Sequence, residues 1–169
     1  AGMLDVLSVG PNEWDIVRNG DSDFQTVISR RSGAGVVLAM NSQKDGLKNA
    51  EVRQAVFRAI DPWNYLDIAW SGEGFSSVGI PVRESDWLLD RTDVRQNFFA
   101  DPGKARQLLL NSGLTLPIDL EITISTDQIG IGHLVLEEEL ISDLTDVGFK
   151  PELRRMNPAQ FSEFVIGPM

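Results

Sequence analysis

The fold of this chain is decided by residues 49–61, which read Asn-Ala-Glu-Val-Arg-Gln-Ala-Val-Phe-Arg-Ala-Ile-Asp and are followed by Pro62. Apolar residues recur there at i, i+3, i+4, i+7 and i+8, which is one face of an α-helix: Val52, Ala55, Val56, Ala59 and Ile60. Asn49 is suited to cap this helix, because its side-chain oxygen can accept an N–H of the first turn. Pro62 cannot continue the helix, since proline lacks an N–H and its ring clashes with the preceding turn. The pair Asp61-Pro62 therefore predicts the start of a second helix.

Composition limits the kind of protein that this can be. The chain has 169 residues, enough for one domain with a sizeable core. Its net charge is −10, with 25 acidic and 15 basic residues, which argues against nucleic acid or an anionic membrane as partner. There is no cysteine, hence no disulfide and no thiolate chemistry. No apolar run reaches the length of a membrane span, and residues 1–10 lack the pattern of a signal peptide.

The remaining pattern predicts an α/β (α+β) fold, a mixed sheet with flanking helices. We expect strands over residues 3–9, 24–30 and 36–41, the last apolar on both faces and so central in its sheet. A short helix is expected over 13–18. The segment 79–99 has no clear period and is expected to be irregular. Asp101-Pro102 starts a further helix that Gly113 ends, and Asn157-Pro158 starts the last one, with Phe161, Phe164 and Val165 on its apolar side.

Residues 120–156 are expected to form a βαβ unit. Residues 120–126 alternate apolar and polar, as in a half-buried strand. The longest helix is expected over 131–147, with five residues facing the core: Leu134, Leu140, Ile141, Leu144 and Val147. A second strand is expected over 150–156. Strands joined through a helix in this way should be parallel.

No combination of residues predicts a reaction. The glycine pairs at 33/35, 72/74 and 130/132 lack the context of a phosphate-binding loop and are expected to serve turns or helix starts. His133, the only histidine, has no nucleophile motif around it. Residues 19–23 alternate oxygen ligands, but they lack the closing glutamate of a calcium loop.

The run Glu137-Glu138-Glu139 raises the alternative of paired catalytic or metal-binding carboxylates. Adjacent helix residues point in different directions, however. Glu138 and Glu139 fall with Asp143 and Asp146 on an arc that we interpret as solvated. Glu137 instead falls near the apolar face, where we expect it to reach the edge or to meet an arginine.

Aromatic residues are the strongest candidates for ligand contacts, because aromatic faces stack on sugars and peptide side chains. Trp63 has helical spacing with its apolar neighbours, which favours a place in the core. Trp14 follows a Gly-Pro turn, and Trp70 and Phe75 flank the glycine loop at 71–77. For these three residues, both a core role and a ligand-binding role stay open.

Three pieces of sequence, in this order, resemble a known family. They are an apolar run ending in Asn41, then Val52-Arg-Gln-Ala continuing to Ala-Ile-Asp61, then Lys104-Ala-Arg-Gln-Leu-Leu continuing to Gly113. Together they resemble the extracytoplasmic solute-binding proteins of ABC importers, in the peptide, nickel and oligosaccharide branch (solute-binding family 5). The resemblance spans about residues 2–166, and Met40 stands where the family usually has phenylalanine. That family is much longer and carries an export signal. The resemblance therefore implies that residues 1–169 are a single domain, the second lobe of a two-lobed protein with a periplasmic-binding-protein type II-like fold.

The resemblance implies a binding function without a chemical step. A solute, with a peptide favoured over an oligosaccharide or metal chelate, would lie in the cleft between two lobes and pass to ABC permease subunits. The location would be periplasmic or extracytoplasmic, peripheral to the membrane through the full-length protein, with no cofactor, metal or catalytic residue. The expected ligand-binding residues, three of which are the aromatic candidates named above, are Ser8, Glu13, Trp14, Asn41, Trp70 and Phe75. We expect the first three to lie on one rim with the loop near Phe75.

Two alternatives stay open at the level of sequence. The chain could be a small stand-alone α/β enzyme, such as a hydrolase that uses acidic residues, although no complete active site can be assembled from its residues. It could also be an interaction domain, which would fit a sequence that has no reactive constellation.

Overall fold

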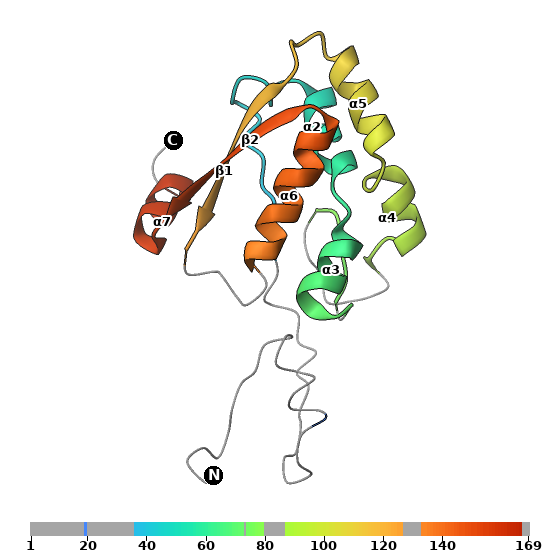
Figure 1. The fold of residues 1–169 in the computed structure, drawn as a ribbon, viewed down its shortest axis with the longest axis vertical. Coiled ribbons are helices and arrows are strands. Elements are labelled where there is room, and N and C mark those ends of the chain that lie inside the picture. Colours follow the sequence, from blue (N-terminus) through green and yellow to red (C-terminus); the bar gives the residue numbers. More distant parts are fainter. Residues whose placement is uncertain (1–18, 20–35, 73, 80–86, 127–132, 167–169) are drawn as a thin grey trace.

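The computed structural model describes residues 19, 36–72, 74–79, 87–126 and 133–166. Two strands form a sheet, and the helices gather around it (Figure 1). In chain order the elements are α2 (Ala50–Ala59), α3 (Pro62–Trp70), α4 (Arg91–Asn97), α5 (Pro102–Asn111), β1 (Ile118–Ser125), α6 (His133–Val147), β2 (Phe149–Met156) and α7 (Pro158–Ile166). Figure 1 shows α6 alongside the strands, α2 to α5 on one side of the body and α7 at its opposite end. The predicted class, helices flanking a sheet, is confirmed.

The βαβ unit forms as the pattern predicts. β1 and β2 are parallel, in a register that runs from Ile118 opposite Phe149 to Ser125 opposite Met156. Ile118 and Leu120 are buried, whereas Asp119 between them is exposed, because successive residues of a strand point to opposite faces. The helix α6 connects the two strands and contributes Leu144 and Val147 to the core.

The predicted helix over residues 49–61 is α2, and its ends are formed by local hydrogen bonds. Asn49 Oδ1 accepts the Glu51 N–H at 2.8 Å, so Asn49 is the cap that the sequence predicts. Asp61 Oδ1 accepts the Trp63 N–H at 3.1 Å and so starts α3. The apolar face of α2 is buried, with Val52, Ala55, Val56 and Ala59 each less than a tenth exposed.

The predicted helix after Asp101 is α5, and it packs against α2. Asp101 Oδ1 accepts the Lys104 N–H at 2.8 Å, and Leu109 is completely buried. The Asp101 N–H also donates to the Arg58 carbonyl at 2.8 Å, which ties the start of α5 to the end of α2. Gly113 has φ 73°, a left-handed conformation that suits the end of a helix.

The predicted central strand at residues 36–41 is wrong. None of these residues is in the described sheet, and Val36 and Val37 are 73% and 77% exposed. Leu38 and Met40, by contrast, pack against the core. Apolar character on both faces therefore does not mean that both faces are buried.

The prediction that segment 79–99 is irregular is also wrong in part, because α4 lies within it. Asp90 caps this helix by accepting the Thr92 N–H at 2.7 Å. Val94 is the one buried residue of α4, where it joins Trp63 and Phe99 in a second apolar cluster. A helix with a single buried residue produces no apolar period, which explains why the pattern missed it.

The expected faces of α6 and α7 are only partly correct. Leu140 is partly buried and Ile141 half-buried, while the side chain of Leu134 lies outside the described residues. In α7, Asn157 and Gln160 cap the helix start reciprocally, but Phe164 and Val165 are exposed rather than covered. The expected strands at 3–9 and 24–30 and the helix at 13–18 lie outside the described residues, as do residues 20–23 of the segment with alternating oxygen ligands.

Candidate functional site

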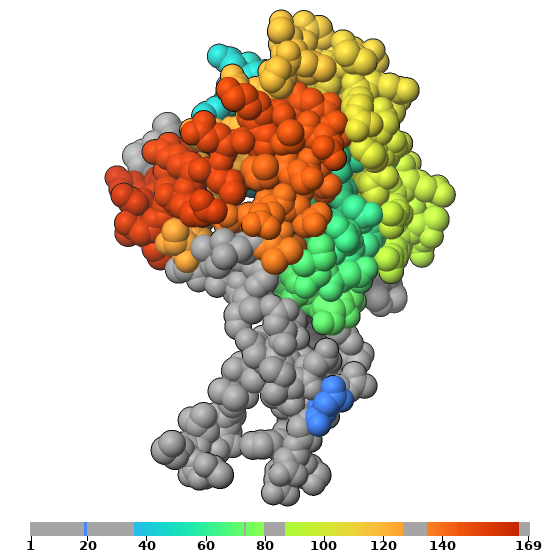
Figure 2. Space-filling model, viewed as in Figure 1, coloured from blue at the N-terminus to red at the C-terminus, as the bar shows by residue number. Residues whose placement is uncertain are grey.

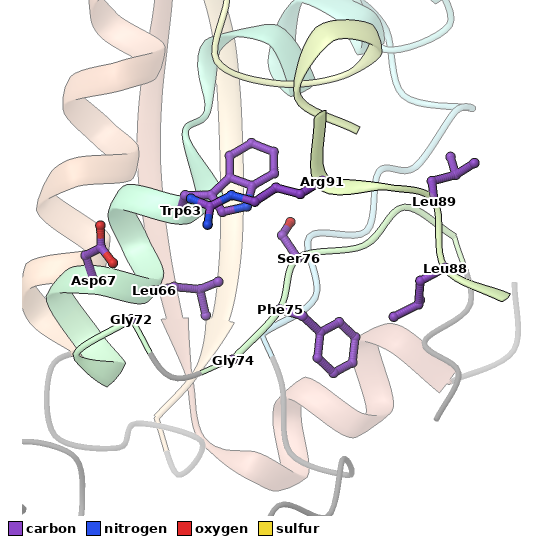
Figure 3. A pocket seen from close by; sticks show the side chains of 10 residues that line it. All are labelled: Trp63, Leu66, Asp67, Gly72, Gly74, Phe75, Ser76, Leu88, Leu89 and Arg91. Carbon is purple, nitrogen blue, oxygen red and sulfur yellow. The ribbon is translucent and has the colours of Figure 1, made fainter. Parts of the chain in front are cut away.

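The surface around the end of α3 contains a hollow of about 160 Å³. It lies between α3, the loop at residues 71–79 and the segment leading into α4 (Figure 3). In the space-filling view, α3 forms the lower edge of the described body, with α4 beside it (Figure 2). The lining residues come from these three segments: Trp63, Leu66, Asp67, Gly72, Gly74, Phe75, Ser76, Leu88, Leu89 and Arg91.

Backbone conformation after α3 directs the loop back over the helix. Ser71 and Gly72 are left-handed, with φ 50° and 77°, and the Gly72 N–H donates to the Leu66 carbonyl at 3.1 Å. Gly74 has φ 145°, and a Cβ at this position would lie 2.9 Å from Cδ2 of Leu66. Glycine therefore permits both the turn and the close approach to the helix. The next residue, Phe75, is thereby placed at the hollow.

Apolar side chains form part of the wall of the hollow, and its base is the buried ring of Trp63. Trp63 is only 6% exposed and packs edge-to-face against Phe99, with ring centroids 6.1 Å apart. Phe75 is 49% exposed and Leu89 55% exposed, so these side chains present apolar surface to solvent. Figure 3 shows Phe75 and Leu88 close to one another on the side away from Trp63.

Two arginines stack on Trp63, and among the described residues only one of them, Arg95, has an acidic partner. The guanidinium carbons of Arg91 and Arg95 lie 5.4 Å and 5.2 Å from the Trp63 ring centroid. Arg95 forms a 2.9 Å ion pair with Asp61. Arg91, which lines the hollow, forms no ion pair within the part of the chain that the structure describes. Asp67 also lines the hollow, but it is not ion-paired with Arg91.

The acidic residues of α6 take part in packing. Asp143 is half-buried and accepts the Tyr65 hydroxyl at 2.7 Å, so its predicted place on a solvated arc is wrong. Burial raises the pKa of Asp143, and burial together with Asp143 raises the pKa of Tyr65 far above its usual value. Glu137 is buried and pairs with Arg155 of β2, which confirms the expectation that it meets an arginine. Across the described ranges, no cluster of three or more His, Asp or Glu side chains could hold a metal ion.

The structure brings one of the predicted site residues to the hollow. Phe75 lines it, whereas Trp70, at the end of α3, is half-buried and does not. Asn41 is exposed and also lies apart from the lining, and its Oδ1 accepts the Gln43 N–H at 2.9 Å within a turn. Ser8, Glu13 and Trp14 lie outside the described residues, so their expected rim stays a prediction.

Pattern analysis missed the other main contributor to the hollow, Arg91. The sequence contains one hint of a helix that begins at Arg91, because Arg91 directly follows Asp90 and aspartate commonly caps helices. Leu88 and Leu89 also line the hollow, and the sequence pattern does not indicate them because they lie in the segment 79–99, which has no clear period.

None of the helices in the described part of the chain is both long enough and apolar enough to cross a membrane.

Known proteins resemble this chain over part of their length. Heme-binding protein A of Haemophilus influenzae is 30% identical over 114 residues, which cover 67% of this chain and 20% of that protein. The structure of the ABC transporter substrate-binding protein CtaP of Listeria monocytogenes is similar with a TM-score of 0.60 at 19% identity, covering 73% of this chain and 25% of the other. A dipeptide-binding protein of Pseudoalteromonas sp. SM9913 in complex with Met-Leu has a TM-score of 0.58 at 21% identity, covering 75% and 25%.

The chain thus spans about a fifth of the curated relative and a quarter of each of these structures. Residues 1–165 match the family model described as bacterial extracellular solute-binding proteins, family 5 Middle, and the chain belongs to that family.

Proposed function

We propose that this chain forms one lobe of the substrate-binding protein of an ABC importer. The family match over residues 1–165 carries this proposal. Members of the family are binding proteins rather than enzymes, so the hydrolase alternative is set aside. The chain works outside the cytoplasmic membrane, where it holds a small solute against a second lobe. Closure of the two lobes then presents the solute to permease subunits.

The proposed contact surface of this lobe is the hollow beside α3. Its half-exposed Phe75 and the neighbouring leucines offer apolar surface, and Arg91 and Asp67 add one charge of each sign. Ligand sites combine apolar surface with polar groups that orient the ligand, and the lining of this hollow contains both. Ser8, Glu13 and Trp14 are proposed as further contacts on the rim of the same cleft. Asn41 and Trp70 are proposed contacts outside the hollow.

A peptide is the solute that we propose. The relatives carry names for different solutes, heme in one case and a dipeptide in another. The hollow of about 160 Å³ is smaller than the roughly 300–1,000 Å³ of sites for drug-sized ligands, so it accommodates one side-chain-sized group rather than a macrocycle. Peptides consist of units of that size.

Solute binding by the native protein that contains this chain tests the proposal. Short peptides, oligosaccharides and heme would be titrated separately by calorimetry. We expect a peptide to bind and Phe75→Ala to weaken its binding about tenfold, because the aromatic surface that the peptide would cover is lost. Phe164→Ala is the matched control, since Phe164 is similarly exposed at 53% but lies on α7, and it should leave the affinity unchanged.

Two results would count against parts of the proposal. A native protein that binds none of these solutes and resides in the cytoplasm would overturn the transport function. Peptide binding that Phe75→Ala does not weaken would remove the hollow from the site, while the transport function would stand.

A further inference from the structure

We propose that Asp61, Glu139 and Asp143 form an acid-sensitive junction between α3 and α6, which is stabilised when the pH falls. We call these three side chains the carboxylate junction. It determines how firmly α3 is held, and α3 carries Trp63 and Leu66 of the hollow. The inference goes beyond the proposed function and does not depend on it, because it concerns the contact between two helices and no solute takes part.

The carboxylate junction lies where α3 packs beside α6 (Figure 1). Asp143 accepts the Tyr65 hydroxyl of α3 at 2.7 Å and also the backbone N–H of Asp61, which caps α3. Glu139 lies one helical turn before Asp143, so the two side chains share a face of α6. Its Oε2 accepts Asn64 Nδ2 at 3.5 Å. Among the described residues these carboxylates are not arranged to hold a metal ion.

This arrangement disfavours the charged form of Asp143. The side chain is half-buried, and burial raises the pKa of its carboxyl group. The negative charges of Glu139 and Asp61 act in the same direction, and together these effects outweigh the hydrogen bonds that favour the carboxylate. A proton on Asp143 removes the repulsion, and the neutral carboxyl group still has an oxygen that can accept the Tyr65 hydroxyl.

Arginines of the other elements near α6 are engaged with groups of their own. Each has a partner in the structure: Arg95 of α4 has Asp61, Arg155 of β2 has Glu137, Arg106 of α5 has the Asp146 carbonyl, and Arg58 of α2 has the Gln96 carbonyl. The pair of Arg95 and Asp61 adjoins the carboxylate junction and offsets part of the charge of Asp61. Burial and the neighbouring Glu139 still act on Asp143, so this pair does not reverse the response to pH.

The direction of the response follows from the raised pKa of Asp143. Because this pKa lies above the ordinary value of about 3.9, the closed junction binds the proton more tightly than an open one does. The resulting contribution to stability is complete below about pH 3.9 and is lost as the pH rises through the raised pKa. An aspartate that is stabilised in its charged form by a salt bridge responds in the opposite direction.

Tyr65 offers a direct reporter of this proton, because it is the only tyrosine in the chain. In a chain labelled with ¹³C-tyrosine, the Tyr65 ring signals should titrate with an inflection above about pH 4. Asp143→Asn resembles the protonated state and cannot titrate, so this variant should lose the inflection. Asp146→Asn is the control, since it removes the same charge from an exposed position on α6, and it should keep the inflection. Glu139→Gln removes a like charge and should move the inflection to lower pH.

Amide hydrogen exchange measures how firmly α3 is held. In wild type, the equilibrium constant for opening of α3 should fall about threefold or more between pH 7 and pH 4, since each unit of raised pKa changes it tenfold. Asp146→Asn should show the same change, and Asp143→Asn a change that is smaller by that factor. Comparison of the two variants cancels the contribution of the other carboxylates, because each variant lacks one negative charge of α6.

The inference is overturned if the inflection persists in Asp143→Asn, or if it lies below about pH 4 in wild type. It is also overturned if the opening of α3 depends on pH in Asp143→Asn as it does in wild type. Should Asp143→Asn fail to fold, Glu139→Gln decides, and an inflection that does not move to lower pH there contradicts the inference. None of these results bears on the proposed function, because none involves a solute or the location of the native protein.

Discussion

The Tyr65 hydroxyl donates a 2.7 Å hydrogen bond to Oδ2 of Asp143 and so joins α3 to α6, across 78 residues of sequence. Asn64, beside Tyr65, reaches Glu139 of α6 at 3.5 Å. These contacts hold the helix that also supplies Leu66 and Asp67 to the hollow. The position of the proposed site therefore depends on a polar contact between helices that are distant in the chain.

Removal of this hydroxyl should destabilise the fold. Tyr65→Phe removes one of the hydrogen-bond donors to the half-buried Asp143, which also has a backbone hydrogen bond with Asp61, and we expect a loss of about 1 kcal/mol in the free energy of unfolding. Urea unfolding followed by circular dichroism measures the loss. Asp143→Asn, which keeps an acceptor for the hydroxyl, should cost less. If Tyr65→Phe unfolds at the wild-type urea concentration, the contact contributes nothing to stability.

The pH dependence of this contact can be followed directly, because Tyr65 is the only tyrosine in the chain. Burial and the Asp143 carboxylate raise the pKa of Tyr65, so the folded state keeps the phenolic proton at a pH where the unfolded state loses it. The contribution to stability is therefore full below about pH 10 and is lost as the pH rises above that value. Phenolate absorbance near 295 nm should appear together with alkaline unfolding. A reversible phenolate transition near pH 10 in a folded chain would contradict this.

The ion pair between Glu137 and Arg155 joins α6 to β2 and should contribute to stability. Arg155→Met removes the guanidinium from a buried carboxylate, and we expect a loss of about 2–3 kcal/mol, since Arg155 itself is half exposed. Arg154→Met is the control, because Arg154 and its partner Glu121 are both substantially exposed and 3.9 Å apart, so it should cost less than about 1 kcal/mol. Equal losses in thermal or urea unfolding would show that burial of the carboxylate is unimportant.

Two adjacent leucines of α5 provide a test of the core. Leu109 is completely buried, and Leu109→Ala should cost about 3 kcal/mol through lost transfer energy and the cavity left behind. Leu110 is 69% exposed, and Leu110→Ala should change stability by less than about 0.5 kcal/mol. Urea unfolding of the two variants measures both losses in the free energy of unfolding. A similar loss in both would mean that α5 packs through a different face.

Much of the architecture follows from local signals in the sequence. Asn49, Asp61 and Asp101 cap the helices whose starts the sequence predicts, since each accepts a hydrogen bond from an N–H two or three residues further on. The alternation that begins at Leu120 predicts β1 and its buried face. Such features depend on near neighbours in the chain, and the sequence displays them directly.

Other features could not be predicted because their causes lie elsewhere in the fold. The helix α4 buries only Val94, and what covers Val94 is the cluster of Trp63 and Phe99. The apolar run at residues 36–41 looks like a buried strand, yet Val36 and Val37 are exposed because what covers a residue is set by its surroundings and not by its own type.

The sequence by itself determined the main helix starts, the βαβ unit and the family resemblance. Each of these depends on the order and spacing of residues along the chain. Only the tertiary structure decided that Arg91 and Phe75 line one hollow and that Asp143 bonds to Tyr65 rather than facing solvent. Those relationships arise when α3, α4 and α6 pack, and packing brings together residues whose separation in sequence carries no periodic signal.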